Sequence, residues 1–362
     1  MTDNRFDIVV VGAGMAGASL AAHLADHASV LVLEGEDRPG YHTTGRSAAF
    51  WTESYGGPGV QPLTTASGPM LRDLGVLSTR TALTIGRAEQ TRDVEAFASR
   101  YAKLGIDVQL LDHEQMAQHV PGLRSAWTRG ALEPSCSDID VGALHAHYLA
   151  KLRQGGAELW CHARLVAVTR SSAGWQLTLE DGRRVRCATV VNAAGAWADP
   201  VARLAGVRPL GIAPLRRTIA QLRVAPSVPA RLPLVLDIAE RFYFKPDAGR
   251  LWLSPHDETP SAPCDAAADE VDVATAIERL KDVVDWSVER LEHRWAGLRS
   301  FAPDRLPVLG FDPRDTGFFW FAGQGGFGIQ TAPAAAQLGA ALVLGQAIDN
   351  LDPEPYSPLR FG

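Results

Sequence analysis

The chain has 362 residues, of which 46% are hydrophobic and 21% charged, and its formal net charge is -6 at pH 7. This length favours two or three domains with ample core. The mildly acidic balance disfavours a nucleic-acid partner. No stretch approaches the roughly 20 apolar residues of a membrane span, and no secretory signal opens the chain, so we expect a cytoplasmic protein without an integral membrane segment.

The cysteines and histidines indicate no metal site. The four cysteines, Cys136, Cys161, Cys187 and Cys264, lack CxxC spacing, and the histidines form no pattern that is typical of metal ligands. We therefore expect reduced thiols and no metal.

The first 34 residues read as a βαβ unit. An apolar run, Phe6–Val11, leads into the glycine-rich turn 12–17, which opens a helix predicted over Ala18–Ala28. A second apolar strand, Val30–Leu33, ends at Glu34. This order of elements, a strand, a glycine turn, a helix, a second strand and an acidic residue, is the fingerprint of a dinucleotide site.

Each residue of the fingerprint has a physical role. Gly12 permits the tight turn, Gly14 lets the backbone approach a pyrophosphate, and Gly17 lets helix and strand pack closely. The helix N-terminus offers free N–H groups to the phosphates. Glu34 suits ribose hydroxyls and would repel a 2′-phosphate, which disfavours NADP.

The loop that follows favours a flavin over a nicotinamide. Residues 40–50 are rich in Ser, Thr, Gly and Ala. A chain that runs flat under a large isoalloxazine ring needs such small residues, whereas a nicotinamide dehydrogenase does not.

The remaining pattern alternates between helices and short strands. We expect helices over 60–74, 93–104, 111–121, 140–155, 196–205, 270–284 and 332–344. We expect strands over 81–87, 158–161, 165–169, 175–179, 184–187, 189–195, 217–223, 234–237, 241–245, 251–254, 295–301 and 318–322.

This order predicts a discontinuous nucleotide-binding domain with an inserted α+β domain. The α/β segments lie at both ends of the chain, and the middle reads as largely antiparallel sheet. We assign residues 1–75, 140–205 and 305–362 to the nucleotide-binding domain. Residues 76–139 and 206–304 form the predicted substrate-binding domain.

Over nearly its whole length the chain resembles the D-amino-acid oxidase (DAO) family of FAD enzymes. Within the family it is most similar to the FAD-dependent D-arginine dehydrogenase type. The matching stretches are 12–17, Glu34, 39–49, 190–197, 216–217, 242–249, 295–301 and 324–331. The resemblance implies an α/β, glutathione-reductase-like (Rossmann-type) FAD domain and an inserted antiparallel-sheet substrate domain.

The resemblance also implies which residues hold FAD. Besides the fingerprint residues, they lie in the loop after Glu34, at the backbone of Leu165 and in the last glycine-rich turn. The expected cofactor-binding residues are Gly12, Gly14, Ala16, Gly17, Glu34, Thr43, Thr44, Arg46, Ser47, Ala48, Ala49, Leu165, Gly325, Gly328, Ile329 and Gln330. The last turn leads into a helix, so its N–H groups would face the part of the flavin that gains negative charge on reduction.

The family oxidises a Cα–N bond: hydride passes from Cα to flavin N5, and the imine is hydrolysed to a 2-oxo acid and ammonia. The protein orients the substrate. Arg217 and Arg299 match the family's carboxylate-binding arginines, since a guanidinium suits a planar carboxylate. Tyr243 and Tyr55 match site tyrosines, and the Gly326 carbonyl is a candidate acceptor for the substrate amine. Arg216 should point to the opposite sheet face.

Two departures from the D-arginine enzymes alter the expected substrate. Phe50 replaces a histidine, and Ala82 stands where those enzymes have a glutamate for the distal guanidinium. A buried cation without a carboxylate partner is costly. We therefore expect a neutral or apolar D-amino acid rather than a basic one, with an electron acceptor that the sequence does not identify.

Three other functions stay open. A secondary-amine oxidase of the sarcosine or glycine type and a 2-hydroxy-acid dehydrogenase share the cofactor frame and the carboxylate-binding arginines. A non-catalytic flavoprotein or subunit, including a tRNA-modifying one, belongs to a different class. The acidic balance disfavours RNA binding, and the presence of both arginines favours a working site.

Overall fold

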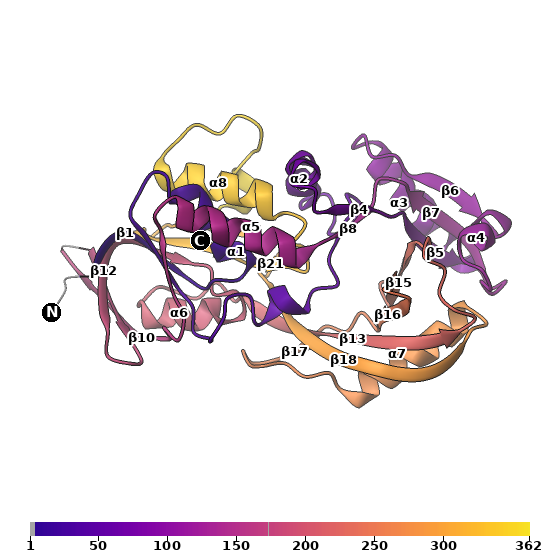
Figure 1. Ribbon diagram of the computed structural model, residues 1–362. Helices are drawn as coiled ribbons and strands as arrows, with labels where there is room; N and C mark the ends of the chain where they lie inside the picture. The colour runs from indigo at the N-terminus through magenta and orange to yellow at the C-terminus, as the bar shows by residue number, and fades with distance from the viewer. Residues whose placement is uncertain (1–3, 173) are drawn as a thin grey trace.

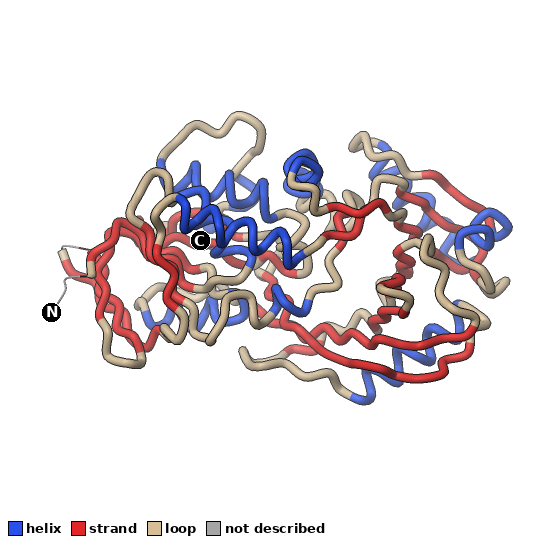
Figure 2. The backbone as a smooth tube through the Cα atoms, in the orientation of Figure 1, coloured by secondary structure: helices blue, strands red, loops and turns tan. Residues whose placement is uncertain are grey.

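The computed structural model describes residues 4–172 and 174–362, and three sheets organise this part of the chain. A large sheet with its helices lies at one end of an elongated molecule, and a second large sheet lies at the other (Figures 1 and 2). A small third sheet lies between them. The molecule therefore combines α/β and antiparallel parts, as predicted.

The first sheet contains the βαβ unit. β1 (Arg5–Val11) lies between β2 (Val30–Leu33) and β12 (Arg184–Asn192) and runs parallel to both. The outer strands are β9 (Glu158–Trp160), β10 (Leu165–Ser171), β11 (Gly174–Leu179), β19 (Val308–Asp312) and β20 (Asp315–Ala322). β12 pairs with antiparallel β11 along its first half and with parallel β20 along its second. It is one strand where the sequence predicted two, and the predicted helix over 196–205 shortens to 198–204.

Helices cover both faces of this sheet. One face carries α1 (Met15–Leu24), α5 (Val141–Gln154) and α8 (Ala332–Leu344), and the other carries α6 (Ala198–Leu204). Because strand side chains alternate, Val10 packs in the cluster with α1, while Val9 packs in the cluster with α6. The strand is consequently apolar throughout, as in parallel sheets buried on both faces.

α1 begins earlier and ends earlier than predicted. It starts at Met15 rather than Ala18, because the Met15 N–H donates to Thr44 Oγ1 (2.9 Å), which caps the helix from a distant loop. The helix ends at Leu24 rather than Ala28. The N–H groups of His27 and Ala28 both donate hydrogen bonds to the Leu24 carbonyl, which closes a turn after the helix.

The second sheet is built on two long strands. β13 (Ala213–Ala225) and β18 (Ser287–Phe301) pair along their length and extend well beyond the predicted strands 217–223 and 295–301. The other strands are β5 (Ala82–Arg87), β6 (Gln109–Asp112), β7 (Trp127–Glu133), β14 (Leu234–Asp237), β15 (Tyr243–Asp247), β16 (Arg250–Ser254), β17 (Thr259–Pro260) and β21 (Gln324–Gly325). All of their pairings are antiparallel except β14 with β5, which is parallel.

Three helices cover the second sheet. They are α3 (Thr91–Ala102), α4 (His113–His119) and α7 (Glu270–Val283). α7 packs against β13, β16 and β18, and α3 and α4 pack against β7. The Asp112 side chain accepts a hydrogen bond from Gln115 N and caps α4, so the helix predicted over 111–121 begins at His113. β6 and β7 were not predicted, because polar residues interrupt their alternation.

The small sheet joins distant parts of the sequence. β3 (Phe50–Trp51) pairs with β8 (Ser137–Ile139), which also pairs with β4 (Leu77–Thr79). α2 (Gln61–Asp73) follows β3 and packs against α8. This sheet therefore links segments assigned to different domains, and the predicted domain boundaries stay a prediction.

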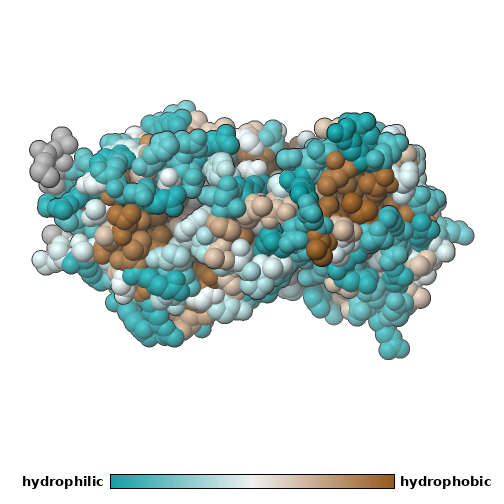
Figure 3. Space-filling model, turned by 90° about the horizontal axis from the view of Figure 1, so that it is seen from below, coloured by the Kyte–Doolittle hydropathy of each residue, from teal (hydrophilic) through white to brown (hydrophobic). Residues whose placement is uncertain are grey.

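The face of the molecule seen in Figure 3 is mainly hydrophilic and carries two apolar patches. Exposed large hydrophobic side chains are scattered over several elements: Leu104, Leu110, Val166, Leu204, Val271, Leu291 and Leu359. Within residues 4–172 and 174–362, no helix has the length and apolar character needed to cross a membrane.

Candidate active site

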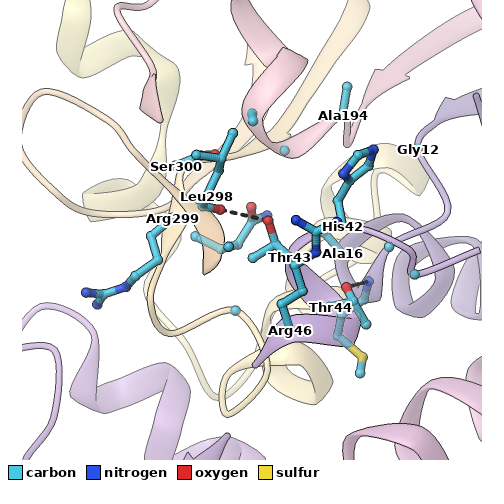
Figure 4. Close-up of a pocket in the computed structure, with 18 of the residues that line it drawn as sticks. Gly12, Ala16, His42, Thr43, Thr44, Arg46, Ala194, Leu298, Arg299 and Ser300 are labelled. Carbon is cyan, nitrogen blue, oxygen red and sulfur yellow. Dashed lines mark hydrogen bonds between the residues drawn. The ribbon is translucent and has the colours of Figure 1, made fainter. Parts of the chain in front are cut away.

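A long pocket runs from the carboxyl ends of β1 and β2 to the inner face of the second sheet. Apart from Gly17, every predicted cofactor residue lines it, and so do all six predicted substrate residues. Figure 4 shows the two ends: Gly12, Ala16, His42 and Ala194 lie together, while the Arg299 side chain points away from them. The pocket thus unites both predicted sites, and the binding roles of these residues stay proposals.

The glycine turn has no room for side chains. Gly12 has φ +103°, and a Cβ there would lie 2.5 Å from the Ala193 carbonyl oxygen. A Cβ on Gly17 would lie 1.8 Å from the Gly12 oxygen, so this glycine serves helix packing behind the pocket rather than lining it. Gly12 and Gly17 therefore have the roles that the fingerprint assigns them: a tight turn at Gly12 and close packing of helix and strand at Gly17.

The Glu34 carboxylate is held at the pocket by two backbone N–H groups. Oε2 accepts from Ala13 N at 3.0 Å, and Oε1 accepts from Glu36 N at 3.1 Å. Each oxygen keeps a lone pair for another donor. An immobilised carboxylate at the end of β2 suits the ribose hydroxyls of a dinucleotide.

The loop after Glu34 ties the two large sheets together. Thr44 Oγ1 caps α1, and Thr43 Oγ1 donates to the Leu298 carbonyl on β18 (2.7 Å; Figure 4). The Arg46 guanidinium donates to the carbonyls of Ala266 and Ala296 and pairs with Asp265. Arg46 lines the pocket, but its charge is already balanced by protein groups.

His42 is a pocket residue that the sequence analysis missed. Its Nε2 lies 3.0 Å from Glu36 Oε1, and its ring lies 4.7 Å from that of Trp197. The buried Nδ1 has no hydrogen-bond partner among the described residues. The signal that could have found it is its place within the matching stretch 39–49. The His42 ring lines the pocket, while its Nδ1 atom is itself buried away from the pocket surface.

The residues present therefore fit FAD along this half of the pocket: they offer glycine backbone at a helix N-terminus and a fixed carboxylate at the end of β2. Among the described residues, no group of three or more His, Cys, Asp or Glu side chains could hold a metal ion.

At the other end, Arg217 and Arg299 extend from neighbouring strands. Arg299 lies opposite Leu215 and Arg217 opposite Gly297, so the two are diagonal neighbours on one sheet face. Both are buried, with 5% and 7% exposure. Arg216 pairs with Asp272 of α7 on the opposite face (2.8 Å), as the alternation predicted.

The two buried guanidinium groups share partners. Arg217 Nε donates to the Asp257 carbonyl (2.8 Å), and Arg299 Nη2 donates to Tyr55 Oη (3.1 Å). Both reach one Glu258 oxygen, at 3.4 and 3.5 Å. Burial lowers the pKa of Arg299. The same burial raises the pKa of Tyr243, which therefore stays a phenol and a hydrogen-bond donor.

Aromatic rings enclose this end of the pocket. The Phe50 ring lies 5.1 Å from that of Tyr55 and 6.1 Å from that of Tyr243. Phe50 and Tyr243 belong to an apolar cluster that also contains Ala82. The nearby carboxylates already have partners: Glu133 accepts from Thr52 and Ser54, and Asp138 pairs with Lys245 and Arg80.

Gln330 fixes the loop that carries Tyr55. Its Nε2 donates to the Tyr55 carbonyl (3.2 Å) and to Thr64 Oγ1 (3.0 Å), and its Oε1 accepts from Thr52 N (3.4 Å). The side chain is thus engaged with protein, which leaves its backbone for a cofactor contact.

A Rossmann-type nucleotide pocket that opens onto a second, buried site is typical of a dinucleotide-dependent enzyme. The pattern of the DAO family, described as FAD dependent oxidoreductase, matches residues 7–342. The chain therefore belongs to the DAO family, and it is an FAD-dependent oxidoreductase.

Relatives of the chain are named for different activities. The chain is 25% identical to hydrogen cyanide synthase subunit HcnC of Pseudomonas aeruginosa, over 99% of this chain and 97% of that protein. It is 26% identical to glycine oxidase of Geobacillus kaustophilus, over 94% and 93% of the two chains. The crystal structure of that oxidase superposes with a TM-score of 0.86 and covers 98% of both chains. L-2-hydroxyglutarate dehydrogenase of Salmonella houtenae is 25% identical over 56% of this chain and 51% of that protein.

Proposed function

We propose that this enzyme oxidises the Cα–N bond of a neutral, apolar D-amino acid and yields a 2-oxo acid and ammonia. The observation that carries the proposal is the pair Arg217 and Arg299, buried side by side and facing an aromatic pocket. Two guanidinium groups suit a carboxylate, and the apolar walls suit an uncharged side chain.

The chain's own residues bind and orient the substrate. Arg217 and Arg299 hold the carboxylate, and the Tyr243 phenol is available as a further donor. The rings of Phe50 and Tyr55 cover the substrate and exclude water. The Gly326 carbonyl is the proposed acceptor for the amine. Bound FAD supplies the hydride acceptor.

Although the sequence resembles the D-arginine dehydrogenases, we do not propose D-arginine as the substrate of this enzyme. Ala82 lies in the apolar cluster beside Phe50, and the described carboxylates nearby, Glu133 and Asp138, already have partners in the protein. A D-arginine side chain would lose its hydration without gaining a partner.

The test is anaerobic bleaching of the bound flavin by a panel of D-amino acids, L-amino acids, glycine, sarcosine and 2-hydroxy acids. We expect apolar D-amino acids to bleach the flavin, and their L-forms to leave it oxidised. A large preference for D-arginine would contradict the proposal. Bleaching by no compound in the panel would favour a non-catalytic flavoprotein.

Arg217→Ala provides the site control, with Arg216→Ala as its match on the opposite sheet face. We expect Arg217→Ala to weaken apparent substrate affinity about 100-fold or more, since a charged partner is lost. Arg216→Ala should retain wild-type affinity because Arg216 pairs with Asp272 outside the pocket.

The second candidate is oxidation of glycine or a secondary amine. The 26% identity to glycine oxidase over 94% of the chain favours it. Bleaching by glycine or sarcosine but by no larger D-amino acid would select this function. The match to L-2-hydroxyglutarate dehydrogenase favours a 2-hydroxy acid in the same way, and bleaching by hydroxy acids alone would select that class.

A further inference from the structure

Glu258 is an acidic residue directly behind the arginine pair. It follows β16, and one of its carboxylate oxygens, Oε1, lies 3.4 Å from Arg217 Nη2 and 3.5 Å from Arg299 Nη1. The same oxygen accepts a hydrogen bond from Arg305 Nη2 at 2.7 Å. Three guanidinium groups thus converge on one oxygen that does not line the pocket.

The segment that carries Glu258 is fixed to the same strand as Arg217. The Asp257 carboxylate accepts from Thr218 N (2.7 Å) and Thr218 Oγ1 (3.0 Å), and the Asp257 carbonyl accepts from Arg217 Nε. Glu258 is therefore placed by its neighbour before any ligand arrives.

Arg305 holds the outer side of this arrangement. Its side chain is 48% exposed, and its guanidinium stacks 3.9 Å from the centre of the Phe301 ring. Its backbone has φ +68°, a conformation that costs a non-glycine residue energy. The residue is thus held against Phe301 and Glu258 at the edge of the site.

Two buried positive charges side by side need a counterion when no substrate is present. Glu258 supplies one negative charge that both arginines share, and the Asp257 carboxylate, with Oδ1 3.9 Å from Arg217 Nε, supplies another to Arg217. A guanidinium has five N–H donors, so the contacts to Glu258, Asp257 and Tyr55 leave donors for a second carboxylate. That second carboxylate meets the repulsion of Glu258 as well as the attraction of the arginines.

We propose that Glu258 is the resident counterion of Arg217 and Arg299, and that its charge, offset by Arg305, sets how tightly the site binds a substrate carboxylate. The inference rests on the proposed carboxylate-binding role of the two arginines. Glu258 acts through them as a positioning and charge-balancing residue, without touching the substrate.

The test measures binding of benzoate to the oxidised holoenzyme through the change in flavin absorption at constant ionic strength. Removing one nearby negative charge in Glu258→Gln should lower the benzoate Kd by about tenfold. Arg305→Gln removes an exposed partner of Glu258 and should raise the Kd by about threefold. Benzamide, which has the same ring without the charge, should bind wild type and Glu258→Gln alike.

Glu95→Gln is the matched control, because Glu95 pairs with Arg129 and neither residue lines the pocket. It should leave the benzoate Kd unchanged. If Glu258 merely holds the arginines in place, Glu258→Gln will weaken benzoate binding instead of tightening it. Weaker binding or an unchanged Kd would overturn the inference about Glu258 and leave the proposed function standing. Failure of the wild-type holoenzyme to bind benzoate would overturn the carboxylate role of the arginines and, with it, the proposed function.

Discussion

The guanidinium of Arg299 lies over the bare backbone of Gly326. A Cβ built on Gly326 would fall 1.7 Å from Arg299 Nη2 and 2.2 Å from Cζ. The glycine is thus needed for the arginine's position, independently of any hydrogen bond from its carbonyl.

Gly326→Ala should therefore act on substrate binding through Arg299. The backbone of Gly326 is not in the left-handed region, so alanine is conformationally acceptable, and the flexible arginine has to move. We expect substrate KM to rise about tenfold or more with FAD retained, since a displaced charged donor costs a large part of its contact. Gly142→Ala is the control, because the nearest atom to a Cβ built on Gly142 is Asp140 Oδ1 at 3.5 Å. Equal KM values for both variants would contradict this role.

His42→Ala should weaken FAD binding. The imidazole ring lines the cofactor half of the pocket, and Glu36 orients it. Loss of the ring's packing should raise the FAD Kd by about tenfold, measured by quenching of flavin fluorescence on titration of apoprotein. The exposed His147→Ala provides the comparison. Identical FAD affinities in the two variants would remove His42 from the cofactor site.

Ala82→Glu should shift preference toward D-arginine. A buried glutamate in this apolar cluster is costly until a substrate guanidinium pairs with it. We expect the ratio of kcat/KM for D-arginine over D-leucine to rise about tenfold, as for a partly buried ion pair. Ala82→Gln has the same size without the charge and should leave that ratio near the wild-type value. If both variants change the ratio equally, shape and not charge decides it.

His256 should make the fold less stable as the pH falls below 6.5. Burial, followed by the charges of Arg217 and Arg299, lowers the pKa of His256 to about 2, from an ordinary value of 6.5. Between these values the unfolded chain binds a proton that the folded chain does not, so the free energy of unfolding decreases with falling pH. His256→Asn, which tolerates the φ of +55° at this position, should lose less thermal stability between pH 7 and pH 4.

The exposed His27→Asn is the comparison for this experiment, and it should follow the wild-type pH profile. The measurement is the thermal unfolding midpoint as a function of pH. Parallel profiles for wild type and His256→Asn would show that folding does not lower the pKa of His256.

The sequence by itself determined the nucleotide-binding half of the protein. Strand, glycine turn, helix and Glu34 are contiguous, so the sequence pattern alone identifies the βαβ unit. The close contact of Gly17 with Gly12 lies within this unit, whereas the space at Gly12 is limited by the distant Ala193 carbonyl. The alternation along β13 also placed Arg217 and Arg216 on opposite faces. Resemblance to the family, rather than spacing, singled out Arg217 and Arg299 as a pair.

Only the tertiary structure decided how the substrate end is arranged. The register of β13 with β18 makes Arg217 and Arg299 neighbours across more than 80 residues of sequence. Chain folding also places Glu258 behind both arginines and Gly326 beneath one of them. Such contacts arise from long-range strand pairing and loop packing, which leave no periodic signal in the sequence. The start of α1 at Met15 has the same cause, because its cap comes from Thr44 in a distant loop.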